Sequence, residues 1–247
     1  MSKISALVRR ELSAFFVSPI AYIDLTVFLV LAGRDFAYNR AYFSPDAGQF
    51  AYGAVASLLN YMSVMILFLV PLLTMRLISE EINSGTMETL MTAPVSNTAV
   101  VISKFLGTFG FFVVMLIPTL AFPIMLYLIS GDLKPDTGPM ISGYFGLLLL
   151  GMAAIAVGVC VSACVKNQIS AAVAAALILA LLWRAGAETA GRATDWLTQS
   201  VQYLGILYHF ESFAKGIIDT RDVIYYVTAT ALFLFAAVGV VAVRRWR

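Results

Sequence analysis

The chain has 247 residues, of which 61% are hydrophobic and 12% are charged, and its mean hydropathy is +0.89. This composition excludes an ordinary soluble domain and is typical of a polytopic membrane protein. The formal net charge of +2 gives no indication of a nucleic-acid-binding surface.

Residues 3–16 form the first predicted element, an amphipathic helix. Its apolar side chains recur at helical spacing, opposite basic and hydroxyl side chains. They are Ile4, Leu7, Val8, Leu12, Phe15 and Phe16. Such a helix lies in the membrane interface and leads into a span. We therefore interpret the N-terminus as an interfacial helix and not as a signal peptide.

Six stretches meet or approach the roughly 20 apolar residues that cross a hydrocarbon core of about 30 Å. They are residues 16–33, 52–75, 99–129, 140–164, 169–187 and 222–243. The third is too long for one straight helix, and Pro118 and Pro123 predict a kink in it. Ala154, Gly158 and Ser162 share one face and predict close helix packing. The sequence therefore predicts an all-α fold, with six transmembrane helices in one membrane domain over residues 1–247.

Asp24 lies inside the first predicted span. A carboxylate at the middle of a span costs about 2.5 to 3.5 kcal/mol on insertion scales, and apolar neighbours that each contribute about 0.3 to 0.6 kcal/mol can offset it. One interpretation is a polar group on a translocation path or a dimer seam. The other is an acid near the cytosolic leaflet, hydrogen-bonded to Tyr or Thr side chains.

A polar passage at residues 76–98 separates the second and third spans. Residues 76–82 are expected to continue the second span as a helix, and the Asn-Ser-Gly sequence at 83–85 is expected to break it. Thr86 then caps a second short helix, with Glu88 in its first turn. This helix presents Met87, Leu90 and Met91 as an apolar patch. The passage is either a docking piece for a groove on a cytosolic partner or an amphipathic loop on the membrane.

Residues 188–221, between the fifth and sixth spans, are too apolar for a plain loop and too interrupted for a span. We expect a re-entrant hairpin of short helices in the outer leaflet. At its end come five ionisable residues: His209, Glu211, Asp219, Arg221 and Asp222. They form a candidate site for a substrate headgroup or an accessory protein. Alternatively, Thr220 or Asp222 caps the sixth span, and no zinc site is expected, because the chain has a single histidine.

The distribution of basic residues predicts the orientation. With six spans both termini lie on one side, and the basic clusters at residues 9–10 and 244–247 flank spans on that side. Lys and Arg beside spans favour the cytoplasmic side. Both termini and the passage at 76–98 are therefore expected to face the cytosol.

Three stretches carry a family resemblance. Glu80-Glu81, followed by Gly85-Thr86-Met87-Glu88-Thr89-Leu90 and Pro94, resembles the coupling-helix signature of type-2 ATP-binding-cassette (ABC) exporter permeases. The SPIAY sequence at 18–22 and the HFESFAKGIIDTRD sequence at 209–222 resemble a narrower branch, the permeases associated with gliding motility. The resemblance covers the chain in order and topology, and Asp24 departs from it.

This resemblance implies a six-span permease in the cytoplasmic (inner) membrane of a bacterium or archaeon, acting as a homodimer in contact with lipid. Each copy would contact one of two separate ABC ATPase subunits through the passage at 76–98, and an accessory protein is expected at the outer face. The coupling residues would be Glu80, Glu81, Gly85, Thr86, Met87, Glu88, Leu90 and Met91.

The chain itself is not expected to be an enzyme or to bind a cofactor. It has no G-x-x-x-x-G-K-[ST] loop for a nucleotide phosphate, so ATP and Mg²⁺ would belong to the partner ATPase. It also has no H-E-x-x-H sequence, no G-x-S-G sequence and no pair of intramembrane aspartates for an intramembrane hydrolase. The alternative function is a non-transporting anchor or mechanotransmitting scaffold for an ATPase and an accessory protein.

Overall fold

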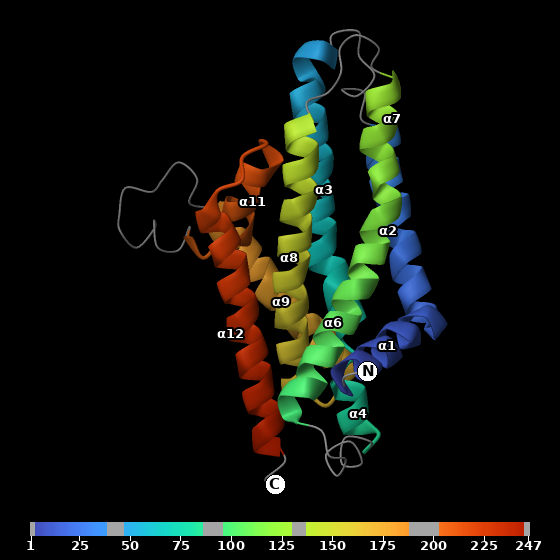
Figure 1. The fold of residues 1–247 in the computed structure, drawn as a ribbon, viewed down its shortest axis with the longest axis vertical. Helices are drawn as coiled ribbons and strands as arrows, with labels where there is room; N and C mark the ends of the chain where they lie inside the picture. The colour runs from blue at the N-terminus through green and yellow to red at the C-terminus, as the bar shows by residue number, and fades with distance from the viewer. Residues whose placement is uncertain (1–2, 39–46, 86–95, 130–136, 188–202, 245–247) are drawn as a thin grey trace.

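The computed structural model describes residues 3–38, 47–85, 96–129, 137–187 and 203–244, and its regular elements there are helices (Figure 1). The chain order is α1 (Lys3–Val17), α2 (Pro19–Tyr38), α3 (Ala47–Thr74), α4 (Ser79–Asn83), α6 (Asn97–Leu116), the 3₁₀ helix η2 (Ile117–Leu120), α7 (Ala121–Ile129), α8 (Thr137–Cys164), α9 (Gln168–Ala187), α11 (Ile206–Ala214) and α12 (Thr220–Arg244). The predicted all-α class is confirmed.

The predicted spans correspond to α2, α3, α6 with α7, α8, α9 and α12. In the described residues five candidate spans are long and apolar enough to cross a membrane, whereas α1 and α2 meet this criterion only as a pair bent by 71°. Charged residues within α2 lower its hydropathy and explain the weaker first span. The chain is therefore a multi-pass membrane protein with five to six spans.

The bend between α1 and α2 occurs at Ser18 and Pro19. The residue before a proline disfavours the helical conformation, and a proline suits the first position of a new helix. The bend lays α1 across α6, where a Cβ on Gly107 would lie 2.7 Å from the Cβ of Glu11. Phe15 stacks on Phe111 with ring centroids 5.1 Å apart. The predicted N-terminal helix is therefore packed against the bundle.

The third span is interrupted where its sequence predicts a kink. The 3₁₀ turn η2, which contains Pro118, separates α6 from α7. Tyr144 of α8 donates a hydrogen bond of 2.8 Å to the carbonyl oxygen of Thr119. A neighbouring helix thus satisfies a carbonyl at the break, as membrane proteins require of interrupted helices.

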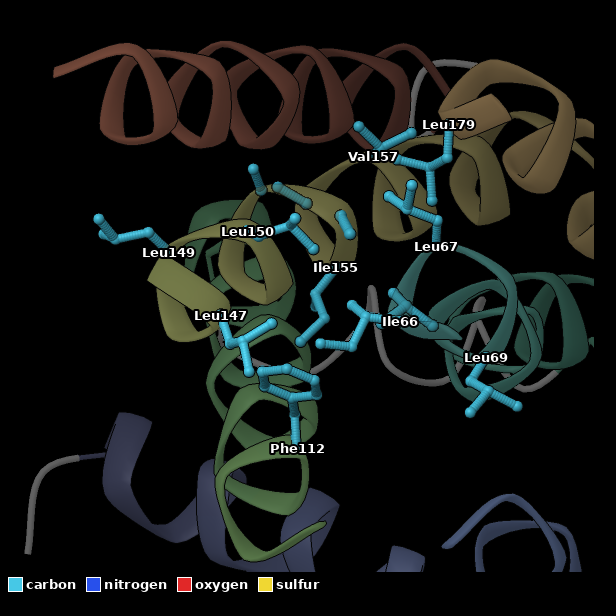
Figure 2. Close-up of a cluster of buried hydrophobic side chains, with 14 of the residues drawn as sticks. Ile66, Leu67, Leu69, Phe112, Leu147, Leu149, Leu150, Ile155, Val157 and Leu179 are labelled. Atoms are coloured by element: carbon cyan, nitrogen blue, oxygen red, sulfur yellow. The ribbon is translucent and has the colours of Figure 1, made fainter. Parts of the chain in front are cut away.

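Helix α8 forms the centre of the bundle and contacts α3, α6, α9, α11 and α12. Figure 2 shows Leu147 of α8 beside Phe112 of α6, and Ile155 of α8 beside Ile66 of α3. Small residues allow this close approach, because a Cβ on Gly158 would overlap Thr74 of α3. The predicted small-residue packing of the fourth span is confirmed at this position.

Gly158→Ala is expected to destabilise the bundle by about 1 to 3 kcal/mol, the usual cost of overpacking a close contact. The added methyl group collides with Thr74, whose side chain is buried. Gly239→Ala on α12 is the matched control, because a Cβ there meets nothing within 4 Å. Thermal unfolding in detergent measures both, and equal unfolding temperatures would contradict the packing.

Figure 1 places the start of α1, the end of α12 and α4 at one end of the bundle, and α11 on the half away from α4. Of the predicted hairpin at 188–221, residues 188–202 lie outside the described residues. The described part contains α11, which contacts α3, α8, α9 and α12. The fold therefore separates two groups of candidate site residues, one near α4 and one around α11.

Candidate functional site

The sequence predicted that the second span continues as a helix through residues 76–82. This prediction is wrong, because the helix is interrupted before residue 79. Helix α3 ends at Thr74, and α4 begins at Ser79 after a turn. In a continuous helix the N–H groups of Ile78 and Ser79 would donate to the carbonyls four residues earlier. Here both donate to the hydroxyl oxygen of Ser162 on α8, each at 3.1 Å.

The hydroxyl group of Ser162 provides the hydrogen bonds that a continuous helix would have provided here. Its hydroxyl accepts the two N–H groups and donates to the carbonyl oxygen of Met75 at 3.2 Å. The side chains of Ser162 and Ser79 are fully buried. Because buried backbone groups must find partners, this hydroxyl fixes the start of α4 against the central helix α8.

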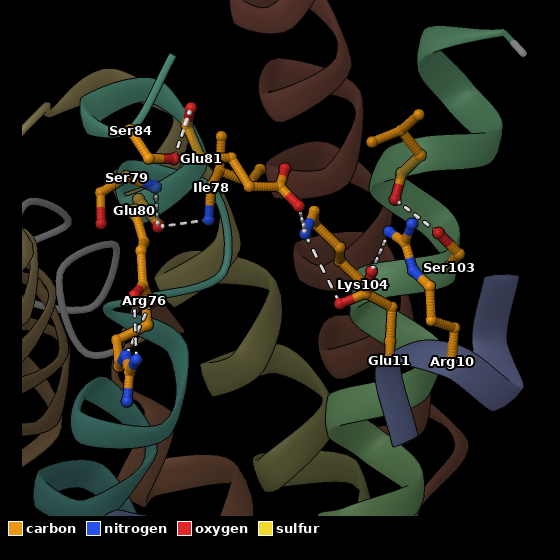
Figure 3. A network of polar contacts seen from close by, with 12 residues as sticks. Arg10, Glu11, Arg76, Ile78, Ser79, Glu80, Glu81, Ser84, Ser103 and Lys104 are labelled. Atoms are coloured by element: carbon orange, nitrogen blue, oxygen red, sulfur yellow. Dashed lines mark hydrogen bonds and ion pairs between the residues drawn. The ribbon is translucent and has the colours of Figure 1, made fainter. Parts of the chain in front are cut away.

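A buried lysine ties α4 to two other helices (Figure 3). Lys104 of α6 contacts Glu81 of α4 at 2.7 Å and Glu11 of α1 at 3.5 Å. The Lys104 side chain is 3% exposed, whereas those of Glu11 and Glu81 are 12% and 23% exposed. Arg10 adds a contact of 2.8 Å to Glu11. We call Ser162, Lys104, Glu81 and Glu11 the α4 joint, because they connect α4 to α1, α6 and α8.

A cavity of about 260 Å³ opens beside the α4 joint. Its lining includes the joint carboxylates, Lys104, and the ion pair of Arg76 and Glu80. This pair is bidentate, with N–O distances of 2.7 and 2.9 Å. The rest of the wall comes from the end of α1, the start of α2 and the end of α3, together with Ser18, Leu77 and Ser84. Glu81 thus connects α4 to α6 through Lys104, whereas Glu80 pairs with Arg76 in the segment that joins α3 to α4.

The predicted helix break at residues 83–85 is present. Gly85 has a φ of +71°, a conformation that residues with a side chain rarely adopt. The predicted coupling residues that follow, namely Thr86, Met87, Glu88, Leu90 and Met91, lie outside the described residues. Of the predicted coupling set, the structure therefore places Glu80, Glu81 and Gly85.

The second group surrounds His209, which is 2% exposed. Its Nδ1 lies 2.7 Å from Oδ1 of Asp222, and its Nε2 lies 3.0 Å from the carbonyl oxygen of Tyr203. The imidazole ring stacks on Tyr225 with centroids 3.9 Å apart. These contacts join the N-terminal part of α11 to the first turn of α12.

All five predicted outer-face residues line one cavity of about 330 Å³. The remaining lining residues are Tyr203, Tyr208, Ser212, Lys215 and Ile217. Asp219, and not Thr220 or Asp222, caps α12, because its Oδ1 accepts the N–H of Arg221 at 2.9 Å. Thr220 and Asp222 are the first and third residues of α12, so neither of them occupies the capping position, which precedes the first helical residue.

Asp24 lines neither of the two cavities. It is 3% exposed and shares the inward face of α2 with Ala21 and Phe28. Neither of its carboxylate oxygens has a hydrogen-bond partner among the described residues. The alternative that required a Tyr or Thr partner therefore finds no such partner in this part of the chain.

Sequence reasoning missed the two residues that organise the α4 joint. Lys104 could have been found from the sequence, because it is a charged residue inside a predicted span. Charged residues inside spans often mark functional sites, and this criterion had already selected Asp24. Ser162 was assigned to packing alone, and its backbone partners lie more than 80 residues away in sequence. Within the described residues, no group of three His, Cys, Asp or Glu side chains is placed to hold a metal ion.

Comparison with known families places part of the chain in a transporter family. The family model described as "ABC-2 family transporter protein" matches residues 35–184, which run from α2 through most of α9. No curated protein matches the chain significantly. The matched region contains α4 with Glu81, Lys104 and Ser162, and it ends before the cavity around His209.

Proposed function

Because this chain belongs to the ABC-2 family of transporter proteins and is a membrane permease subunit, we propose that separate ATPase subunits drive it through residues 76–98. In this proposal ATP-driven movement of the partner displaces α4, and the spans then rearrange to export a substrate or extract it from the membrane.

The α4 joint is the observation that carries this proposal. Helix α4 has only five residues, yet a buried hydroxyl and a buried ammonium group attach it to three helices. Charge-assisted and backbone hydrogen bonds are directional, so a displaced α4 moves its partners with it. The central position of α8 extends this movement to α9, α11 and α12.

The complete assembly that we propose contains two permease copies and two ATPase subunits, which bind ATP and Mg²⁺. The end of the bundle with α4 and both termini faces the cytosol across a bacterial or archaeal inner membrane. The resemblance to gliding-motility permeases suggests an accessory protein near the opposite face. Basic residues beside the spans support this orientation.

Gly85→Pro is expected to abolish co-purification of the ATPase while membrane insertion stays intact. Proline holds φ near −65°, so it cannot adopt the +71° found at this position, and residues 86–98 are redirected. Gly85→Asn is the matched control, because asparagine tolerates the left-handed region and a Cβ here meets nothing within 4 Å. Affinity purification in mild detergent, followed by a measurement of ATPase activity, compares the variants.

Normal co-purification with the proline variant would contradict a coupling role for this passage. Glu88→Lys reverses a charge in the same passage and is expected to weaken the ATPase contact as well. The scaffold alternative is tested separately, in vesicles reconstituted with permease and ATPase. If the protein is a transporter, its substrate stimulates the ATPase activity. If the protein is a scaffold, the substrate does not change the ATPase activity.

A further inference from the structure

A cavity of about 590 Å³ lies between α8 on one side and η2 with α7 on the other. Most of its lining side chains are large and apolar, and most of these are exposed. Six of them are Leu120, Ile124 and Leu128 on the side of α7, and Ile141, Phe145 and Leu148 on α8. We call this cavity the α7–α8 groove.

The contacts on either side of the break at η2 explain why the groove exists. Phe122 of α7 stacks on Phe36 of α2, with ring centroids 5.2 Å apart, and α7 runs beside α2 (Figure 1). The turn η2 stays on α8, because Tyr144 donates to the carbonyl oxygen of Thr119 at 2.8 Å. The third span therefore contacts α8 at η2 and diverges from it along α7, and the groove occupies the angle between them.

The groove lies at membrane depth, in the leaflet opposite α1. An interfacial helix such as α1 marks one membrane boundary, and α2 rises about 26 Å between Pro19 and Phe36. Because the hydrocarbon core is about 30 Å thick, Phe36 and its partner Phe122 lie in the half of the core that is farther from α1. The groove is therefore surrounded by the acyl chains of that leaflet.

The lining favours a hydrocarbon over water or a polar ligand. A bound water molecule needs about two to four polar partners. Among the described residues, the lining side chains with a polar atom are those of Tyr127, Thr137 and Tyr144, and the Tyr144 hydroxyl already contacts Thr119. Tyr127 and Thr137 lie near the end of α7 and at the start of α8, where a polar tip suits the headgroup region. The space between these ends suits an apolar occupant.

The same lining disfavours a helix of a second permease copy. Transmembrane helices approach each other through small residues, and α8 follows this rule elsewhere, because a Cβ on Gly143, Gly151 or Gly158 would overlap a side chain of α3 or α6. The described residues that line the groove include no glycine, alanine or serine. The connecting segment 130–136 is also a poor occupant, because three of its seven residues are charged. A flexible hydrocarbon chain fits large, irregular side chains better than either.

We propose that the α7–α8 groove binds an acyl chain of a membrane phospholipid in the leaflet opposite α1. The chain supplies the dispersion contacts that the large side chains of an unfilled groove would lack. The groove shares no lining residue with the cavity at the α4 joint or with the cavity around His209. The inference goes beyond the coupling proposal, because it concerns a lipid that the permease holds and not the movement that drives it.

Photolabelling with a lipid tests this proposal. The full-length protein in detergent micelles is titrated with a phosphatidylcholine that carries a diazirine in one acyl chain, and labelled peptides are measured by mass spectrometry after irradiation. We expect several-fold more label on α7 and the first half of α8 than around Leu181 of α9 and Leu232 of α12, which are also exposed. Labelling of the groove is expected to saturate as the lipid concentration rises, whereas labelling of the other surfaces increases in proportion.

Two tryptophan substitutions at exposed isoleucines give a matched comparison. Ile141 lines the groove and is 71% exposed, whereas Ile224 of α12 is 61% exposed and does not line the groove. Ile141→Trp places an indole ring in the groove and is expected to reduce its labelling to the level of α9. Ile224→Trp is expected to leave the labelling of the groove unchanged. Because both side chains are exposed, neither substitution overfills the core.

A photo-crosslinking amino acid at Ile124, irradiated in native membranes, identifies the occupant. We expect an adduct whose added mass is that of a phospholipid. An adduct with a second permease copy, or with residues 130–136 of the same chain, would overturn the proposal. Equal labelling of the groove and α9, or undiminished labelling of Ile141→Trp, would overturn it as well. Since no ATPase takes part in these measurements, their failure leaves the coupling proposal untouched, and failure of coupling leaves them valid.

Discussion

Lys104→Ala is expected to reduce transport-coupled ATPase activity by roughly 30-fold, the equivalent of about 2 kcal/mol of lost coupling free energy. The substitution removes the cation that lies 2.7 Å from Glu81 and links α4 to α6 and α1. Removing one partner of a fully buried pair costs about 3 to 5 kcal/mol. We expect a smaller effect because Glu81 is 23% exposed and Glu11 keeps its contact with Arg10.

Two comparisons make this result interpretable. Lys166→Ala changes an exposed lysine in the turn between α8 and α9 and is expected to leave activity unchanged. Lys104→Met with Glu81→Leu replaces the pair by apolar side chains, which is expected to recover much of the stability. Thermal unfolding and ATPase activity in reconstituted vesicles measure the two effects. Full coupled activity in Lys104→Ala would exclude Lys104 from the coupling path.

Ser162→Ala is expected to loosen α4 from the central helix and to lower the free energy of unfolding by about 2 to 6 kcal/mol. The substitution leaves the N–H groups of Ile78 and Ser79 without their acceptor, and each buried, unpaired group costs about 1 to 3 kcal/mol. Hydrogen–deuterium exchange at residues 75–83 is expected to become faster, because the free energy of the local opening that exposes these amides falls by a similar amount.

Ser103→Ala is the matched control for this experiment. Ser103 is also buried, and its hydroxyl donates to the carbonyl oxygen of Val100 within its own helix. Its loss frees no backbone N–H group, so a change below about 1 kcal/mol is expected. Unchanged exchange at residues 75–83 in Ser162→Ala would show that Ser162 does not hold α4.

The spans were predictable because their signal is local. Length and hydropathy located the six apolar stretches, and the prolines of the third stretch predicted its 3₁₀ break at η2. The predicted ends of the spans lie within about five residues of the helices, the usual precision at helix ends being a few residues. The first span is the weakest of the six, because α2 meets the length and hydropathy criterion only together with α1.

The joint between α3 and α4 was not predictable from the local sequence. Residues 75–78 contain no residue type that is typical of a turn. The turn depends instead on Ser162, which provides the replacement hydrogen bonds from another helix. The five outer-face residues were selected as a group, and the structure brings them to one cavity. Their arrangement depends on the pairing of α11 with α12, so the contact of His209 with Asp222 could not be predicted from the residue types.

The most direct test of the account asks where the ATPase touches this permease. A photo-crosslinking amino acid at Asn83, which is exposed at the end of α4, would be compared with the same group at Ile217 near the opposite cavity. We predict an adduct from position 83 alone, with a protein that mass spectrometry identifies by its G-x-x-x-x-G-K-[ST] loop. An ATPase adduct from position 217, with no adduct from position 83 in the assembled complex, would contradict the proposal that the ATPase moves the permease through α4.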